Sequence, residues 1–266
     1  MKICVIGAGI IGSSIARSLL ISKYGSEIVA TRRRTEKLKE LEELGATITS
    51  NNKEAAAKAD IVILSVKPKD VKNVLTEIRN EVKGKLVISV AAAIPLESLR
   101  NFAPEARFVR AMPNLAVLVQ ESFTAYCMSP EVTREDRKRV EEIFGKMGKY
   151  TEVEEQHMNA ITGLSGSGPA YVSIIVEAMM YAGLKVGLPR ELALFASAQT
   201  VTGTGKLILE SKRHVAELKD MVVTPGGTTI EGIYQLEDSG IRTAIMRAVE
   251  AAMKKSEKIS ETIKNQ

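Results

Sequence analysis

The residues best suited to chemistry lie near the C-terminus, in the stretch Thr224-Pro225-Gly226-Gly227-Thr228-Thr229. Thr224 suits the N-cap of a helix and Pro225 its first turn, and apolar residues at helical spacing follow. The two glycines remove side chains from that turn, so free backbone N–H groups and the helix dipole could bind an anion such as a carboxylate. A well-capped helix after a tight loop is the plain alternative. The segment alone leaves both interpretations open.

A second candidate site lies at the N-terminus, where the apolar run 2–6 leads into Gly7-Ala8-Gly9-Ile10-Ile11-Gly12 and then a helical pattern. Between a strand and a helix, such glycines allow a tight turn, close approach of a pyrophosphate to the backbone, and close helix packing. The pattern predicts dinucleotide binding. The alternative is a glycine-rich turn in an unrelated α/β protein.

The next predicted strand, 27–31, decides which dinucleotide is favoured. NAD enzymes place an acid at its end to hold the ribose 2′-hydroxyl, but this chain has Thr31-Arg32-Arg33-Arg34. Arginines attract a 2′-phosphate by charge-assisted hydrogen bonds. NADP(H) is therefore the favoured cofactor, with NAD(H) as the second candidate. The alternative is that the arginines form a solvated basic loop that binds no cofactor.

Two further segments follow predicted strands at 61–66 and 86–90, namely Ser65-Val66-Lys67-Pro68 and Val90-Ala91-Ala92-Ala93. A doubly wound sheet binds its ligand outside the carboxyl ends of its strands. The small alanines would let a nicotinamide ribose sit close. Lys67 is either a cofactor contact or a solvated strand-end lysine.

Other kinds of catalytic site have little support. The two histidines, His157 and His214, lack metal-ligand spacing, and we expect a structural role for the first and a solvated position for the second. No G-x-S-x-G elbow or H-E-x-x-H motif is present, and we predict no metal. Cys4 and Cys127 lie in apolar, strand-like runs, which suits buried reduced thiols and an intracellular, cytoplasmic protein.

The order of the elements predicts the fold class. Short β-branched runs at 46–50, 107–112, 124–128 and 150–153 alternate with charged helical segments at 35–44, 69–81 and 133–147. This alternation indicates an α/β fold with a Rossmann-type doubly wound parallel sheet, covered by helices on both faces. From 154 onward the signals are helical. We therefore predict two domains, 1–153 and 154–266, the second all-α.

The helical half predicts a partner subunit. The segment 170–183 is apolar on every side, which is typical of a buried helix, yet about 110 residues can hardly enclose it. Glu177 and the short length argue against a membrane span. Helices are also predicted at 188–209 and 242–263.

Composition excludes several function classes. The 266 residues are 45% hydrophobic and 26% charged, which is ordinary for a globular protein, and the net charge of +5 is spread over the whole length. With only 4% aromatic residues and no basic cluster on one motif, nucleic-acid binding is disfavoured. No stretch reads as an export signal or a membrane span.

Several motifs together resemble the pyrroline-5-carboxylate reductase family over essentially the whole chain. They are the N-terminal glycine pattern, VKP at 66–68, RAMPN at 110–114, TGLSGSGPAYV at 162–172 and LKDMVVTPGGTTIEGIYQLE at 218–237. The resemblance implies NAD(P)H-dependent reduction of a cyclic imine, 1-pyrroline-5-carboxylate, to L-proline. It also implies a homodimer formed through the helical domain and its assembly into a larger oligomer.

The resemblance also implies the roles of individual residues. The cofactor contacts would be Gly7, Ala8, Gly9, Ile10, Ile11, Gly12, Arg32, Asn52, Ser65, Val66, Lys67, Pro68, Val90, Ala91 and Ala92, to which the arginine run after the second predicted strand adds Arg33. The substrate contacts would be Thr224, Gly227, Thr228 and Thr229. Thr229 matches the threonine whose hydroxyl faces the imine nitrogen, and is the expected catalytic residue.

Two rival functions share the N-terminal half. A β-hydroxyacid dehydrogenase would place a lysine shortly after a glycine-rich helix start, but Tyr171 stands at the comparable position. A non-enzymatic NADP-binding sensor would leave the anion site at 226–229 without a purpose. Both rivals are therefore disfavoured.

Overall fold

The computed structural model describes residues 1–25 and 27–264 and divides the chain into two compact units. One consists of Met1–Ser167 and Val249–Gln266, the other of Gly168–Ala248. These units differ from the predicted domains 1–153 and 154–266. The reason is that Met158 and Ile263, which follow the predicted boundary, pack into the core of the first unit.

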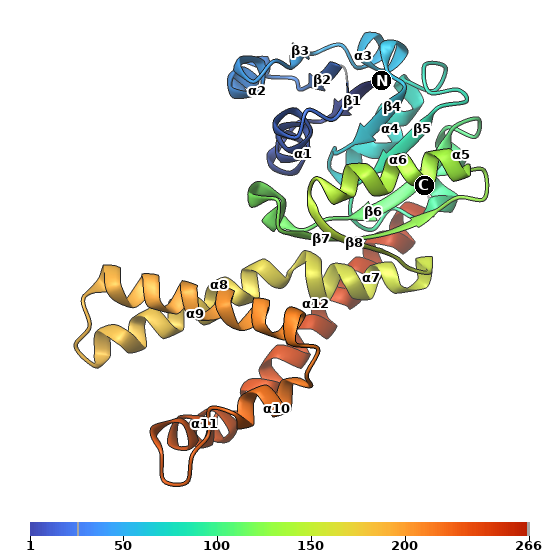
Figure 1. Ribbon diagram of the computed structural model, residues 1–266. Helices are drawn as coiled ribbons and strands as arrows, with labels where there is room; N and C mark the ends of the chain where they lie inside the picture. The colour runs from blue at the N-terminus through green and yellow to red at the C-terminus, as the bar shows by residue number, and fades with distance from the viewer. Residues whose placement is uncertain (26, 265–266) are drawn as a thin grey trace. The chain divides into compact units, whose positions relative to one another are not determined.

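The first unit contains an eight-stranded sheet with the order β3-β2-β1-β4-β5-β6-β7-β8 (Figure 1). The strands are β1 (Lys2–Ile6), β2 (Glu27–Thr31), β3 (Thr47–Thr49), β4 (Ile61–Leu64), β5 (Leu86–Ser89), β6 (Arg107–Met112), β7 (Ser122–Met128) and β8 (Gly148–Glu152). All neighbours are parallel except β6 and β7. The order 3-2-1-4-5-6 is that of the Rossmann fold, and its direction reverses between β1 and β4. The predicted fold class is confirmed.

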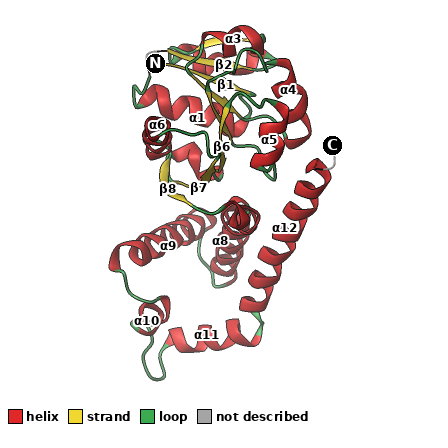
Figure 2. Ribbon diagram, turned by 90° about the vertical axis from the view of Figure 1, so that its right-hand side faces the viewer, coloured by secondary structure: helices red, strands yellow, loops and turns green. Residues whose placement is uncertain are grey.

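Helices cover both faces of this sheet (Figure 2). Successive residues of β1 point to opposite faces: Ile3 and Val5 join one apolar core, while Cys4 and Ile6 join the other. The first core is closed by α1 (Ile10–Ile21), α2 (Lys39–Glu43) and α6 (Arg134–Gly145). The second is closed by α3 (Asn52–Lys58), α4 (Val71–Glu77), α5 (Leu96–Phe102), α7 (Met158–Ile161) and the end of α12 (Ile241–Lys264).

Both cysteines are buried free thiols, as the sequence predicts. Burial raises the pKa of Cys4 and of Cys127 to about 12, because a thiolate would lose its hydration inside the core. Neither sulfur is therefore a nucleophile at neutral pH.

A partly buried ion pair joins α6 to the sheet. The Asp136 carboxylate accepts hydrogen bonds from Arg107 Nε at 2.6 Å and Nη2 at 3.0 Å, and also from the backbone N–H and hydroxyl of Thr133. Burial raises the pKa of the Asp136 carboxyl, but the hydrogen bonds from Arg107 and Thr133 outweigh this effect, and the net pKa lies below its usual range. The pair therefore stabilises the fold only while Asp136 is ionised.

We expect Asp136→Asn to lower the free energy of unfolding by roughly 2 kcal/mol at pH 7, since it removes charge-assisted hydrogen bonds. The folded-state pKa is depressed, so this contribution is present above the unfolded carboxyl pKa of about 3.9 and is lost as the pH falls through the folded value. Urea midpoints at pH 7 and at pH 3 measure it, with the exposed neighbour Glu135→Gln as control. A difference between wild type and Asp136→Asn that is as large at pH 3 as at pH 7 would contradict this account.

The second unit is helical. Its elements are α8 (Gly168–Lys185), α9 (Arg190–Ser211), α10 (Val215–Asp220) and α11 (Thr228–Asp238), with the start of α12. Helices α8 and α9 lie side by side as a hairpin (Figure 1), and a Cβ on Gly183 would come within 2.7 Å of the Ala193 Cβ. Large apolar side chains of this hairpin stay exposed, including Ile174 at 65%, Phe195 at 69% and Leu209 at 76%.

From the sequence, the 170–183 segment is expected to be a helix buried against a partner subunit, and the exposed side chains of α8 are relevant to that expectation. Of α8 only Met180 is buried within the described part of the chain, so the apolar helix is not enclosed by its own unit. None of the helices in that described part combines the length and apolarity needed to cross a bilayer.

Candidate active site

The glycine turn joins β1 to α1 with the geometry that the sequence predicts. Gly7 has a φ of +83°, which favours glycine. A Cβ there would lie 2.5 Å from Val66 Cγ1, and one on Gly12 would lie 2.8 Å from the Gly7 carbonyl oxygen. At Gly9 nothing comes closer than 3.9 Å, so the backbone at the start of α1 faces open space. An anion can therefore approach the N-terminus of this helix.

A cavity of about 550 Å³ opens beside this turn, within the size range of small-ligand sites. It is lined by Ile6, Gly7, Gly9, Thr31, Arg32, Arg33, Arg34, Lys37, Asn52, Ser65, Val66, Lys67, Asp70, Asn73, Val74 and Glu77. These residues come from the carboxyl ends of β1, β2 and β4, from the segments that follow these strands, and from the start of α3. The cavity thus lies where the strand order reverses, as the Rossmann topology requires.

The structure brings together half of the predicted cofactor contacts. Those that line the cavity are Gly7, Gly9, Arg32, Arg33, Asn52, Ser65, Val66 and Lys67. Those outside its lining are Ala8, Ile10, Ile11, Gly12, Pro68, Val90, Ala91 and Ala92. Gly12 lets α1 approach Ser65 at the end of β4, which is the close helix packing that the glycine pattern predicts.

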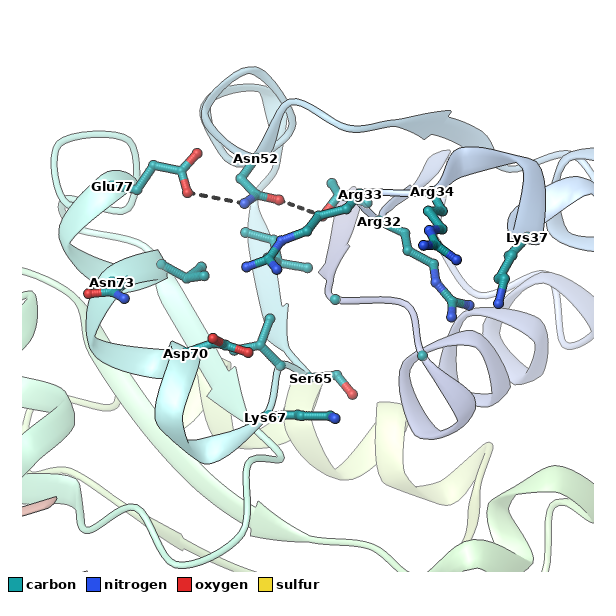
Figure 3. A pocket seen from close by; sticks show the side chains of 16 residues that line it. Arg32, Arg33, Arg34, Lys37, Asn52, Ser65, Lys67, Asp70, Asn73 and Glu77 are labelled. Carbon is teal, nitrogen blue, oxygen red and sulfur yellow. Dashed lines mark hydrogen bonds between the residues drawn. The ribbon is translucent and has the colours of Figure 1, made fainter. Parts of the chain in front are cut away.

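The walls of the cavity differ in charge. Figure 3 shows Arg33 reaching across it between Asn52 and Ser65, with Arg32, Arg34 and Lys37 together beyond. Asp70, Asn73 and Glu77 lie on the opposite side. Within residues 1–25 and 27–264, none of the three guanidinium groups pairs with a carboxylate. The basic wall is therefore available to an anionic ligand.

Asn52 is held in one orientation by two neighbours (Figure 3). Its Oδ1 accepts a hydrogen bond from the Thr31 hydroxyl at 2.7 Å, and its Nδ2 donates to Glu77 Oε2 at 3.2 Å. Thr31 stands at the end of β2, where an acid would sit in an NAD enzyme. Its hydroxyl instead fixes the Asn52 amide, which keeps one N–H for a ligand.

Lys37, Asp70, Asn73 and Glu77 also line the cavity, although no local sequence motif marks them. The last three follow β4 on the η2 turn (Pro68–Asp70) and α4. Because β4 adjoins the reversal of strand order, the topology alone could have marked this segment. Which side chains of α4 point into the cavity depends on the rotation of this helix about its own axis, which the sequence pattern does not determine.

The Thr224–Thr229 stretch differs from the expected helix start. Helix α11 begins at Thr228 with Gly227 as its N-cap, so the prediction of Thr224 as N-cap and Pro225 in the first turn is wrong. Residues 224–227 form a β-turn: the Gly227 N–H donates to the Thr224 carbonyl at 3.0 Å, and Gly226 has a φ of +66°. Proline followed by a positive-φ glycine favours this turn over a helix.

This turn changes which backbone groups can bind an anion. The Gly227 N–H is already used, whereas the first N–H groups of α11 have no partner within their own helix. A Cβ on Gly227 would lie 2.3 Å from Thr224 Oγ1. The absence of a side chain on Gly227 therefore lets the Thr224 hydroxyl lie against the N-cap of α11.

The histidines offer no competing catalytic centre. His214 Nδ1 accepts a hydrogen bond from the Ala216 N–H and caps α10, so this exposed side chain has a structural role. His157 is exposed and precedes α7. Across the described residues, no three histidine, cysteine or carboxylate side chains gather as a metal site would require.

The fold and the cavity define the class of protein, a Rossmann-type dinucleotide-binding oxidoreductase. Comparison with known families agrees: the family described as NADP oxidoreductase, coenzyme F420-dependent, matches residues 2–93. The family described as pyrroline-5-carboxylate reductase dimerisation matches residues 155–259.

Individual relatives are more specific. The chain is 41% identical to the pyrroline-5-carboxylate reductase of Methanosarcina acetivorans, with 97% of each chain covered, and 38% identical to that of Arabidopsis thaliana, over 98% of this chain and 96% of the plant protein. A crystal structure of the Plasmodium falciparum pyrroline carboxylate reductase with NADP bound superposes with a TM-score of 0.90 at 33% identity, covering 98% of both chains. The chain belongs to the pyrroline-5-carboxylate reductase family.

Proposed function

We propose that this protein reduces 1-pyrroline-5-carboxylate to L-proline with NADPH, the last step of proline biosynthesis. The observation that carries the proposal is the basic wall of the cavity, formed by Arg32, Arg33 and Arg34 beside an open glycine turn, in a chain of this family. NADP(H) suits that wall because guanidinium groups bind a 2′-phosphate by charge-assisted hydrogen bonds.

The proposed cofactor site extends from this wall to the ends of β4 and β5. The pyrophosphate would lie on the backbone at Gly9 and the start of α1, where a side chain is absent. Asn52 would offer its remaining N–H to the sugar. Lys67 and the Val90–Ala92 segment would flank the nicotinamide end. When bound, the nicotinamide supplies the hydride.

The proposed substrate site is the start of α11. The N–H groups of Thr228 and Thr229, with the helix dipole, would bind the carboxylate of the substrate. Gly227 would act through its small size, and the Thr224 hydroxyl would lie at the same helix end. The Thr229 hydroxyl would hydrogen-bond the ring nitrogen.

Such a site is sufficient for imine reduction. A protonated imine is already electrophilic at its C=N carbon, so the protein has to orient the ring and the donor rather than supply a strong acid or a metal. The hydride adds to that carbon, the electron pair of the C=N π bond moves to nitrogen, and the product is a secondary amine. The Thr229 hydroxyl holds the nitrogen, and its proton, in position during this step.

The direct assay follows NADPH oxidation at 340 nm after 1-pyrroline-5-carboxylate is added, with 3-hydroxyacids and NADP⁺ as the comparison. We expect turnover with the imine and none with the hydroxyacids. Turnover with hydroxyacids alone would favour a β-hydroxyacid dehydrogenase, and NADPH binding without turnover of either would favour a sensor.

We also propose that the functional unit is a homodimer formed through the α8–α9 hairpin and assembled into a larger homo-oligomer. The exposed apolar side chains of that hairpin support this proposal. The buried reduced thiols suit a cytoplasmic location.

Phe195→Asp is expected to shift the mass measured by light scattering from that of an oligomer toward that of the 28.9 kDa chain, since a carboxylate would be buried unpaired in the interface. Ile21→Asp replaces a residue of similar exposure on α1, and we expect it to leave the mass unchanged. An unchanged mass for Phe195→Asp would remove α9 from the interface.

A further inference from the structure

A buried polar network lies behind the loop that follows β5. Its centre is Asn159 on α7, whose Oδ1 accepts hydrogen bonds from Ser256 at 2.9 Å and from Arg110 at 3.3 Å, and lies 3.3 Å from Ser260 Oγ. Arg110 comes from β6 and is 4% exposed at its side chain, and the two serines come from α12. The network therefore links three elements of the first unit behind one loop.

This network holds the β5–α5 loop at two points. Ser260 Oγ donates to the Ala93 carbonyl at 2.9 Å, and the Leu96 N–H donates to Glu155 Oε1 at 2.7 Å. The same Glu155 oxygen accepts from Arg110 at 2.9 Å. Since a hydroxyl has one proton, the shorter of the two Ser260 contacts, that to Ala93, is the bond it donates.

The loop needs such support because of its backbone. Ala93 has a φ of +62°, a left-handed conformation that is unfavourable for any residue with a Cβ. Outliers of this kind persist when the surroundings fix them, and they gather at ligand sites. Ala93 is buried, so the carbonyl bond to Ser260 is made away from competing water.

The β5–α5 loop starts at the edge of the sheet where a ligand is expected. Val90 N–H donates to the Leu64 carbonyl at 2.9 Å, so the loop starts beside the end of β4, next to the point where the strand order reverses. Ligands of doubly wound sheets bind at that edge. A change in the backbone conformation of Ala93 would therefore displace the Val90–Ala92 backbone.

We infer that Ser260 is a positioning residue for the cofactor: its hydroxyl holds Ala93 in the left-handed conformation and so sets the Val90–Ala92 backbone against the nicotinamide end of NADPH. This inference rests on the proposed function, because that proposal places the dinucleotide along this loop. Ser260 itself does not touch the cofactor. The residue acts through the loop alone.

Ser256 provides a matched control. It lies one turn earlier on the same face of α12, is similarly buried and donates to Asn159 Oδ1, and within the described residues it makes no hydrogen bond to the loop. Removing either hydroxyl therefore perturbs the network. Only the loss of the Ser260 hydroxyl releases Ala93.

The test measures NADPH dissociation constants by fluorescence titration, together with kcat and both KM values. We expect Ser260→Ala to weaken NADPH binding threefold to tenfold, in line with the loss of one hydrogen bond, with kcat and the imine KM within twofold of wild type. Ser256→Ala should stay within twofold in every parameter. Ala93→Gly, added to Ser260→Ala, should restore at least half of the lost affinity, since glycine adopts a positive φ without strain.

The outcomes separate this inference from the proposed function. Unchanged NADPH affinity in Ser260→Ala, equal losses in Ser260→Ala and Ser256→Ala, or no rescue by Ala93→Gly would each overturn the positioning role while leaving the activity in place. A wild-type protein that binds NADPH but does not reduce the imine would overturn the proposed function. The NADPH dissociation constants of the Ser260→Ala and Ser256→Ala variants would still test the role of Ser260.

Discussion

Replacing Arg32 and Arg33 together with serine is expected to remove most of the preference for NADPH over NADH. Each guanidinium group that binds the 2′-phosphate contributes a charge-assisted hydrogen bond, worth about 1.5–3 kcal/mol. Two such losses correspond to a fall on the order of a hundredfold or more in kcat/KM with NADPH. NADH has no 2′-phosphate, so its kcat/KM should change little.

The experiment is a steady-state comparison of both cofactors in wild type and variant. A suitable control is the double variant Arg137→Ser with Arg139→Ser, because it removes the same charge from α6, where both arginines are paired with exposed carboxylates. We expect that control to keep the wild-type ratio. If the ratio of kcat/KM with NADPH to kcat/KM with NADH is unchanged after Arg32 and Arg33 are replaced, the basic wall does not bind the 2′-phosphate.

Thr229→Ala is expected to lower kcat roughly tenfold to hundredfold, the effect of losing one hydrogen bond to a charged group. NADPH affinity should persist, because the proposed cofactor contacts lie at the ends of β1, β2, β4 and β5, in the segments that follow these strands, and at the start of α3. Thr229→Ser keeps the hydroxyl and should retain most of the activity. The measurement is kcat and both KM values, with NADPH titration for binding.

Thr262→Ala serves as the control for this variant, since its exposed hydroxyl donates to the Lys258 carbonyl of its own helix. If Thr229→Ala raises the imine KM but leaves kcat unchanged, the hydroxyl binds the substrate without acting in the hydride-transfer step. Kinetics identical to wild type would remove Thr229 from the mechanism altogether.

The N-terminal half of the fold could be predicted because its signals are local. The apolar runs at 2–6, 27–31, 61–66 and 86–90 became β1, β2, β4 and β5 within two residues, and the glycine turn between the first strand and α1 has the expected geometry. Each of these elements depends on side-chain period and on glycine, both of which are visible in the chain.

The start of α11 could not be predicted, because Thr-Pro-Gly-Gly satisfies two local rules at once. Threonine and proline suit a helix N-terminus, and proline before glycine suits a type II turn. The structure takes the turn, with Gly226 at positive φ, and the helix begins three residues after Pro225, at Thr228. Consequently the Gly227 N–H, a candidate carboxylate donor, is used within the turn.

The other features that could not be predicted from the sequence are contacts between segments far apart in the chain. The Thr31–Asn52–Glu77 chain and the Ser260–Ala93 bond each join elements far apart in the sequence. The same holds for Ile263, which packs into the sheet domain although it follows the helical half. No periodic pattern encodes such pairs, since they depend on how complete elements pack.

The most direct measurement is the fate of the hydride itself. NADPH carrying deuterium at the transferable C4 position is incubated with the protein and 1-pyrroline-5-carboxylate, and the proline formed is examined by mass spectrometry and NMR. The account predicts L-proline with one deuterium on the carbon of the former C=N bond. Proline without deuterium, or no proline while NADPH remains bound, would contradict it.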